Sequence, residues 1–357
     1  MSPAAHDIIR QDAASVAGRL GPHVGQLSGA TVLVTGGGGF LGSSIAEAIA
    51  YVAETGLTDV PPQLVLMSRL APTDAHRLAH LRERPDVTWI LGDLAEPLAG
   101  PTQIDFIVHA ASPASPSEFL ADPVGTAKAN SAALMNLLET AGTHGTRSLL
   151  YLSSSEVYGS PSGDDIPTPE DYPGCVPFTE PRAWYAESKR FGETLCLAYH
   201  RQHGTPARIV RPFHLFGPGM RADDSRLIPA MMMRGVRGES FELAGAGTET
   251  RTYGYVTDGV AAILLALLAG CAGEAYNIGS GGPEDSVLDV TMRIAEVFGR
   301  AEDVAVATRR AEPGRQGTPN RVCPDVTKMR RELGYDFDVS LDEGLARTAM
   351  WFREVYG

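Results

Sequence analysis

Short apolar runs and longer amphipathic stretches alternate through the first two thirds of the chain. Residues 31–35 are β-branched or apolar and lead into four glycines, and residues 40–52 are rich in Ala, Ile and Leu. We therefore expect a strand, a tight turn and a helix there. Further strand-like runs lie at residues 63–67, 87–91, 105–109, 148–153 and 207–211, and helical stretches at 121–141 and 183–203. This alternation predicts an α/β fold around a doubly wound parallel sheet with right-handed crossovers.

The composition of the sequence changes after Arg211, and residues 212–219 are rich in proline and glycine. Residues 252–280 look like a return to the first domain, because they combine a helical stretch with a strand-like run at 275–278. We therefore predict three parts. An N-terminal helical extension covers residues 1–29, a larger domain covers 30–211 plus 252–280, and a smaller α/β region covers 212–251 plus 281–357.

The composition is that of an ordinary globular protein, with 43% hydrophobic and 20% charged residues. A formal net charge of −13 argues against a nucleic-acid partner, which normally requires a basic face. The longest apolar run, residues 260–272, is shorter than the ~20 residues that span a bilayer, so we expect no membrane partner. The first twenty residues mix acids with arginines, unlike a signal peptide, and the prediction is a cytoplasmic location.

The four cysteines, Cys175, Cys196, Cys271 and Cys323, show neither C-x-x-C spacing nor a histidine at zinc-finger distance. We expect buried thiols and no metal site.

Gly36, Gly39 and Gly42 form a G-x-x-G-x-x-G motif between the first predicted strand and the helix that follows. Glycines at this place allow a tight turn, and the helix N-terminus offers free N–H groups to a pyrophosphate. The motif predicts a Rossmann-like, dinucleotide-binding sheet. The second strand ends in Ser68 and Arg69 instead of the acidic residue that accepts the ribose hydroxyls of NAD, so NADP is possible beside NAD.

Tyr185 and Lys189 lie four residues apart on the predicted helix 183–203, so they share one face of it. An ammonium beside a phenol favours the phenolate, and we expect Lys189 to lower the pKa of Tyr185 so that the tyrosine acts as a base. A surface pair with this spacing and no catalytic role is the alternative, and the neighbouring motifs decide against it.

These motifs together resemble the extended short-chain dehydrogenase/reductases that act on nucleotide sugars, and the resemblance covers residues 30–357. It rests on residues 35–42, 92–94, 109–112, 152–159, the pair Tyr185 and Lys189, and Arg251 ahead of residues 255–258. The resemblance implies cofactor contacts by Gly36, Gly39, Phe40, Leu41, Gly42, Ser68, Arg69, Asp93, Leu94, Ala110, Ala111, Ser112, Asn130, Tyr185 and Lys189. It implies contacts with a nucleotide-diphosphate sugar by Pro113, Ser155, Glu156, His214, Arg226 and Arg251.

The family's chemistry begins with oxidation of the sugar C4 hydroxyl. The resemblance implies that Tyr185 removes the proton, that Lys189 holds the cofactor ribose, and that Ser154 hydrogen-bonds the reacting hydroxyl. A 4,6-dehydratase then needs an adjacent Asp and Glu, where this chain has Ser155 and Glu156. The Ser-Glu pair and residues 180–190 are similar to UDP-glucuronate decarboxylases, as is Arg226, which is placed where they carry an arginine near the sugar carboxylate.

Two positions depart from that group, because His214 stands for its usual asparagine and Gly219 for its usual arginine. A decarboxylase-like enzyme is therefore the main prediction, with a 4-epimerase or a 4,6-dehydratase as the alternative. An NADPH-dependent 4-keto-sugar reductase and a non-catalytic scaffold protein are further alternatives. The resemblance also implies a homodimer, in which the helices 121–141 and 183–203 of two copies form a four-helix bundle.

Overall fold

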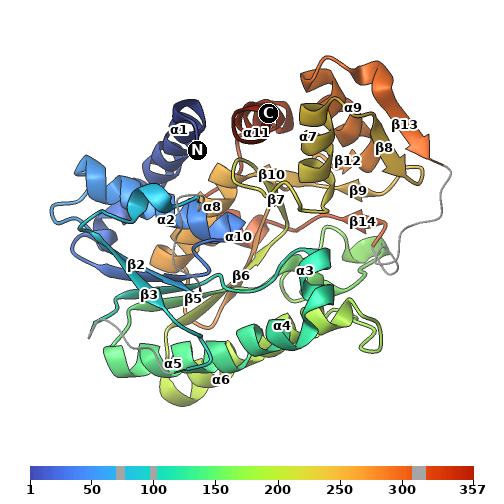
Figure 1. Cartoon of the computed structure of the whole chain (residues 1–357). Helices are drawn as coiled ribbons and strands as arrows, with labels where there is room; N and C mark the ends of the chain where they lie inside the picture. The colour runs from blue at the N-terminus through green and yellow to red at the C-terminus, as the bar shows by residue number, and fades with distance from the viewer. Residues whose placement is uncertain (70–76, 97–102, 308–318) are drawn as a thin grey trace.

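A computed structural model describes residues 1–69, 77–96, 103–307 and 319–357 (Figure 1). Seven parallel strands form the central sheet in the order β11-β6-β5-β4-β1-β2-β3. Their bounds are β1 Thr31–Thr35, β2 Gln63–Ser68, β3 Val87–Leu91, β4 Phe106–His109, β5 Ser148–Leu152, β6 Ala207–Pro212 and β11 Ala275–Ile278. The predicted doubly wound parallel sheet is confirmed, and each predicted strand is found within one residue of its expected bounds.

Helices cover both faces of the sheet (Figure 1). One face carries α1 Pro3–Arg19, α2 Phe40–Thr55, α8 Val256–Ala269 and α10 Thr327–Leu333. The other face carries α3 Pro116–Ala121, α4 Pro123–Asn130, α5 Ala132–His144 and α6 Ala183–His203. The short 3-10 helices are η1 Gly21–Leu27, η2 Ala79–Leu81, η3 Ser155–Tyr158, η4 Gly163–Asp165 and η5 Ala301–Asp303.

The helix expected over residues 121–141 is wrong as a single element, because the chain breaks twice there. Pro123 has no N–H to continue α3, and the Asp122 side chain accepts a hydrogen bond from Gly125 N at 2.9 Å, which starts α4 afresh. A second break at Ser131, outside helical φ and ψ, separates α4 from α5. In contrast, α6 has the bounds expected from the sequence, and it ends at Gly204 in the left-handed conformation.

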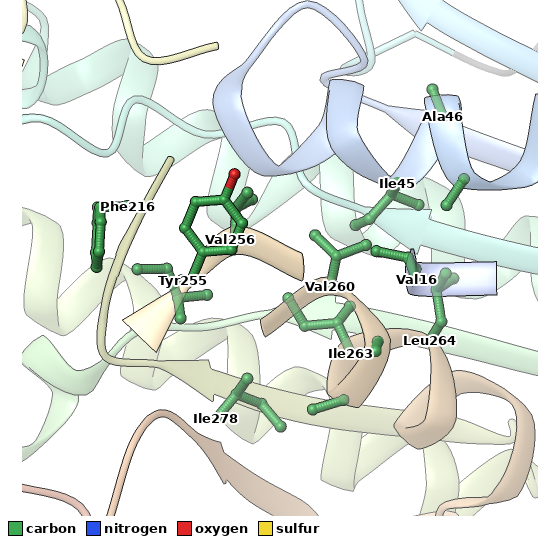
Figure 2. Close-up of a cluster of buried hydrophobic side chains, with 14 of the residues drawn as sticks. Val16, Ile45, Ala46, Phe216, Tyr255, Val256, Val260, Ile263, Leu264 and Ile278 are labelled. Carbon is green, nitrogen blue, oxygen red and sulfur yellow. The ribbon is translucent and has the colours of Figure 1, made fainter. Parts of the chain in front are cut away.

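The larger hydrophobic core includes helix α8, which is buried along nearly its whole length, and a second core lies on the other face of the sheet against α5 and α6. Figure 2 shows Val260, Ile263 and Leu264 of this helix beside Val16 of α1 and Ile45 of α2. A helix that is apolar on all sides can be stable only when other elements surround it. None of the described helices is long and apolar enough to cross a membrane.

The N-terminal helix α1 is fastened to the rest of the chain by two largely buried polar clusters. Asp12 accepts hydrogen bonds from Arg347 at 2.7 Å and from Tyr255 at 2.8 Å. Arg19 pairs with Asp258 at the start of α8. The predicted N-terminal helix is therefore present, and it is part of the packed structure.

Smaller sheets and three helices lie beyond the central sheet (Figure 1). Strand β7 His214–Phe216 pairs with β10 Tyr253–Tyr255, β8 Phe241–Ala244 with β13 Val304–Ala307, and β9 Thr250–Arg251 with β12 Asp285–Ser286 and β14 Arg321–Val322. The helices are α7 Leu227–Arg237, α9 Val287–Val297 and α11 Leu341–Tyr356. The residue boundaries between the two predicted regions remain a prediction. The expectation of four buried thiols is wrong for Cys175 and Cys271, which are exposed, whereas Cys196 and Cys323 are buried.

Candidate active site

The predicted cofactor residues follow the carboxyl ends of neighbouring strands. Gly36 follows β1, Arg69 follows β2, Asp93 follows β3 and Ala110 follows β4. Because these strands are parallel, all four positions lie at one edge of the sheet, and β1 and β4 are neighbours across the point where the strand order reverses. The sheet therefore gathers residues that are far apart in the sequence at the edge where α/β proteins bind ligands.

The glycine turn leaves no room for side chains. Gly36 has φ +71°, and a Cβ on it would lie 2.7 Å from backbone atoms of Ala110. A Cβ on Gly42 would lie 2.2 Å from the carbonyl oxygen of Gly36. Helix α2 then begins after Gly39 without a side-chain cap, so its first N–H groups are available to an anion. A tight, uncapped turn of this kind fits a dinucleotide pyrophosphate.

Other predicted cofactor residues lie around this turn with different exposure. Phe40 and Leu41, the first residues of α2, pack against the core while half-buried. Arg69 is exposed, as is Asp93, whose carboxylate accepts a hydrogen bond from Ala95 N at 3.0 Å. The half-buried residues of this set are Ser68, Leu94, Ala110, Ala111 and Ser112, and the neighbouring Pro113 is half-buried too.

Asn130 links the predicted cofactor edge to helix α6. Its side chain is buried, and its Nδ2 donates to Ser112 Oγ at 3.1 Å and to Ser188 Oγ at 3.0 Å. Its Oδ1 accepts from the hydroxyl of Tyr151 at 3.3 Å. The segment after β4 is thereby fixed against the helix that carries Tyr185 and Lys189.

Tyr185 and Lys189 lie on the inner face of α6, 4% and 3% exposed respectively. The ammonium of Lys189 donates to the carbonyl oxygen of Leu152 at 2.6 Å and lies 4.9 Å from the ring centroid of Tyr151. Its distance to the ring centroid of Tyr185 is 5.8 Å. Burial lowers the pKa of Lys189 to about 7, and the nearby charge of Glu193 acts in the opposite direction.

The expectation that Lys189 lowers the pKa of Tyr185 is not met. Burial raises the pKa of Tyr185 to about 12, against a hydrogen bond with Ser154 that lowers it. The charges of Glu156 and Arg226 act in opposite directions on the same phenol. The ring also stacks on Phe119 with centroids 4.8 Å apart, which contributes to the apolar surroundings that disfavour a phenolate. The hydrogen bond places Ser154 beside the hydroxyl of Tyr185. That Ser154 also hydrogen-bonds the reacting sugar hydroxyl stays a prediction.

Ser155 and Glu156 follow Ser154 in the 3-10 helix η3. Glu156 accepts a hydrogen bond from Arg182 Nη2 at 2.7 Å, and both side chains are only partly exposed. Arg182 is the N-cap of α6, three residues before Tyr185, so the ion pair lies one helical turn from the tyrosine. The carboxylate of Glu156 is therefore already engaged by a cation.

His214 lies close to three arginines. Burial lowers the pKa of its imidazole to about 3, and the charges of Arg251, Arg226 and Arg182 lower it further. Its buried Nδ1 has no hydrogen-bond partner among the described residues. The three arginines come from β9, from the N-cap of α7 and from the N-cap of α6. Only the fold brings them together, and they make a cationic site beside Tyr185.

The arginines of this cluster are not free of other partners. The guanidinium of Arg251 donates to the carbonyl oxygens of Thr250, Pro319 and Asn320. Arg226 makes a two-pronged pair with Asp224, with 2.5 Å between Nη2 and Oδ2. The prediction that Arg251 binds a diphosphate and that Arg226 binds a carboxylate therefore stays a prediction. A ligand would add to these contacts or replace them.

Three residues of the site were not predicted from the sequence. Phe119 stacks on Tyr185, and no sequence signal points to it. Arg182 lies in the stretch 180–190 that resembles decarboxylases, and its spacing to Tyr185 was the available signal. Glu193 lies four residues beyond Lys189 on the same helix face, so the periodicity that found the lysine also reaches it.

Comparisons with known proteins agree with this geometry. Residues 32–279 match the model of the NAD dependent epimerase/dehydratase family. UDP-glucuronic acid decarboxylase 1 of Xenopus tropicalis is 32% identical over 90% of this chain and 72% of that protein. UDP-glucuronic acid decarboxylase 5 of Arabidopsis thaliana is 33% identical over 88% of this chain and 86% of its own length.

A solved structure of DesIV, a dTDP-glucose 4,6-dehydratase from Streptomyces venezuelae with NAD bound, superposes with a TM-score of 0.77. It is 30% identical, and the match covers 91% of this chain and 97% of that one.

Proposed function

The chain belongs to the NAD-dependent epimerase/dehydratase family, and from that premise we propose that it oxidises a nucleotide-diphosphate sugar at C4 and decarboxylates it through the 4-keto form. The observation that carries this proposal is the buried group of Ser154, Tyr185 and Lys189 beside a cluster of three arginines. A sugar that bears a carboxylate as well as a diphosphate matches the charge of such a cluster.

The glycine turn and the uncapped start of α2 are suited to NAD, which when bound would supply the hydride acceptor. Tyr185 would take the proton of the C4 hydroxyl. Ser154, which hydrogen-bonds the Tyr185 phenol, would hold that phenol in position. Lys189, directed towards the same face of α6, would hold the cofactor ribose. Arg69 is exposed after the end of β2, where its guanidinium could bind the 2′-phosphate of NADP, so assays should include NADP alongside NAD.

The residues after Ser154 favour decarboxylation over dehydration. Expulsion of a C6 hydroxyl requires an acid, but Ser155 cannot serve as one and Glu156 is already paired with Arg182. Loss of carbon dioxide from a β-keto acid requires no such acid, because the C4 carbonyl delocalises the carbanion. The relatives named as UDP-glucuronic acid decarboxylases support the same branch.

We assign the nucleotide sugar to the smaller region, residues 212–251 plus 281–357, which contributes His214, Arg226 and Arg251 to the cluster.

We also propose a homodimer. Exposed apolar side chains on the helices α4, α5 and α6 support a helical interface, namely Val124, Met135 and Phe191. Light scattering should give the mass of two chains, and a monomer would count against the interface. A cytoplasmic location, supported by the unpaired thiols, is testable by fractionation.

The experiment that tests the function is incubation of the purified protein with UDP-, dTDP-, GDP- and CDP-linked sugars, including uronates, followed by product mass. Loss of the mass of carbon dioxide from a nucleotide uronate supports the proposal. Loss of the mass of water identifies a dehydratase, and an unchanged mass with altered retention identifies an epimerase. Stoichiometric consumption of added NADPH would instead identify a net reductase.

A further inference from the structure

Three buried polar residues form a column on one face of helix α6. Tyr185, Lys189 and Glu193 are spaced four residues apart, so their side chains lie one above the other. They are 4%, 3% and 8% exposed. The first two belong to the proposed catalytic group, whereas Glu193 lies one turn further from the reacting hydroxyl. Its role needs a separate explanation, because a carboxylate is rarely buried unless a cation or hydrogen-bond donors stabilise it.

Glu193 is fixed from two neighbouring strands. Arg211, from β6, donates to both carboxylate oxygens, with Nε 2.9 Å from Oε1 and Nη2 2.7 Å from Oε2. Ser153, which directly follows β5, donates its hydroxyl to Oε1 at 2.5 Å. Three donor atoms, two of them on one guanidinium, stabilise the ionised carboxylate and leave it little freedom to move. Arg211 also donates to Tyr158, so the arginine itself is well anchored.

The ammonium of Lys189 has few other sources of stabilisation. It donates to the carbonyl oxygen of Leu152 and lies over the ring of Tyr151. That ring lies under α6 because residue 192 is glycine, where a Cβ would come within 2.4 Å of the tyrosine hydroxyl oxygen. Among the described residues, the charge of Glu193 is the main influence that raises the pKa of Lys189, ahead of Cys196.

We propose that Glu193, held in place by Arg211 and Ser153, is a positioning residue that keeps Lys189 protonated while the enzyme works. The proposal rests on the proposed function only in giving Lys189 a part in catalysis. Burial already brings the pKa of Lys189 down to about 7, so removal of the carboxylate would leave a largely neutral amine at that pH. The charged groups that face Glu193 are Lys189 of α6 and Arg211 of β6, and the neutral titratable groups are Cys196 of α6, Tyr151 of β5 and Tyr158 of η3.

The chain has only three lysines, Lys128, Lys189 and Lys328, so the charge of Lys189 can be followed directly. The protein is labelled with lysine carrying carbon-13 at Cε, and the signal of residue 189 is assigned by its loss in Lys189→Arg. We expect Glu193→Gln to move the titration midpoint of this signal to lower pH by about one unit or more. The alkaline limb of the kcat profile should move by the same amount.

The matched control is Glu187→Gln, which removes one negative charge from the same helix at a side chain that is 45% exposed. It should leave the Lys189 midpoint unchanged. Because Glu193→Gln leaves Arg211 buried without its partner, the double variant Glu193→Gln/Arg211→Gln is measured as well. A shift to lower pH in every variant that folds supports the proposal. An unchanged midpoint in any variant that folds overturns it.

The lysine titration is read without substrate, so it separates the two proposals. A shifted midpoint in a protein that turns over no nucleotide sugar leaves the role of Glu193 standing and overturns the proposed function. Turnover of a nucleotide uronate with an unchanged midpoint overturns the role of Glu193 alone.

Discussion

Lys189 should lower the stability of the protein, and by an amount that depends on pH. Its pKa falls from 10.5 to about 7 on burial, so below pH 7 the folded protein carries an ammonium that is more stable in the unfolded chain. This difference corresponds to a cost of about 5 kcal/mol in the free energy of unfolding. We expect Lys189→Met to be inactive but more stable than the natural protein, because methionine has a similar length and no charge.

The net gain should be smaller than this cost. The carbonyl oxygen of Leu152 loses its 2.6 Å donor, which costs about 1–3 kcal/mol in a buried place. Glu193 keeps Arg211 and Ser153, so the substitution leaves no unpaired buried charge. The expected gain below pH 7 is therefore about 2–4 kcal/mol.

The sign of the pH dependence follows from linkage. Between pH 7 and 10.5 the unfolded chain binds a proton at this lysine that the folded chain does not bind, so the natural protein becomes more stable as pH rises. The advantage of Lys189→Met is greatest below pH 7 and disappears towards 10.5. Urea unfolding at one pH below this window and at two within it measures the difference. The control is Lys128→Met on an exposed lysine, for which we expect a change within about 0.5 kcal/mol. A stability difference that stays constant across the window would refute the reasoning.

Three further substitutions test the site and the fold. Tyr185→Phe should still bind NAD but lose at least about 10²-fold in kcat, and near-normal turnover would exclude Tyr185 as the base. Gly42→Ala places a Cβ 2.2 Å from the Gly36 carbonyl oxygen, so NAD affinity measured by fluorescence titration should fall more than about tenfold, whereas unchanged affinity would place the cofactor elsewhere. Asp258→Ala removes the buried carboxylate that accepts from Arg19, Tyr335 and Val339, while Arg19 keeps its pair with Asp338. Unfolding stability in urea should therefore fall by about 1–3 kcal/mol, which a shift below about 0.5 kcal/mol would contradict.

The predictions that held are those that depend on neighbours in the sequence. The strands of the sheet and helix α6 follow from apolar runs and from a 3.6-residue period, both of which are local. The helix expected over residues 121–141 was wrong because Pro123 and Ser131 interrupt a sequence whose composition is otherwise helical. The sign of the Tyr185 pKa was wrong for a different reason. It depends on how completely the fold buries the phenol, and Phe119, which contributes to that burial, comes from a separate helix.

The α6 residues of the site could be predicted from local spacing, whereas the arginine cluster could not. Tyr185, Lys189 and Glu193 are fixed by one helix, so their spacing alone predicts that they meet. The arginine cluster is built from the starts of two helices and from strand β9, and its members lie up to 69 residues apart, from Arg182 to Arg251. We propose that the α6 residues take a proton from an alcohol and that the arginine cluster determines which anionic group of the sugar lies beside it. We therefore expect substitutions on α6 to change the rate with every nucleotide sugar, and substitutions in the cluster to change which sugar is accepted. Arg226→Gln, assayed against a nucleotide uronate and the matching neutral sugar, should lower kcat/KM for the uronate by about tenfold or more and leave binding of the neutral sugar nearly unchanged. An equal loss with both sugars would mean that Arg226 acts on the diphosphate or on the fold.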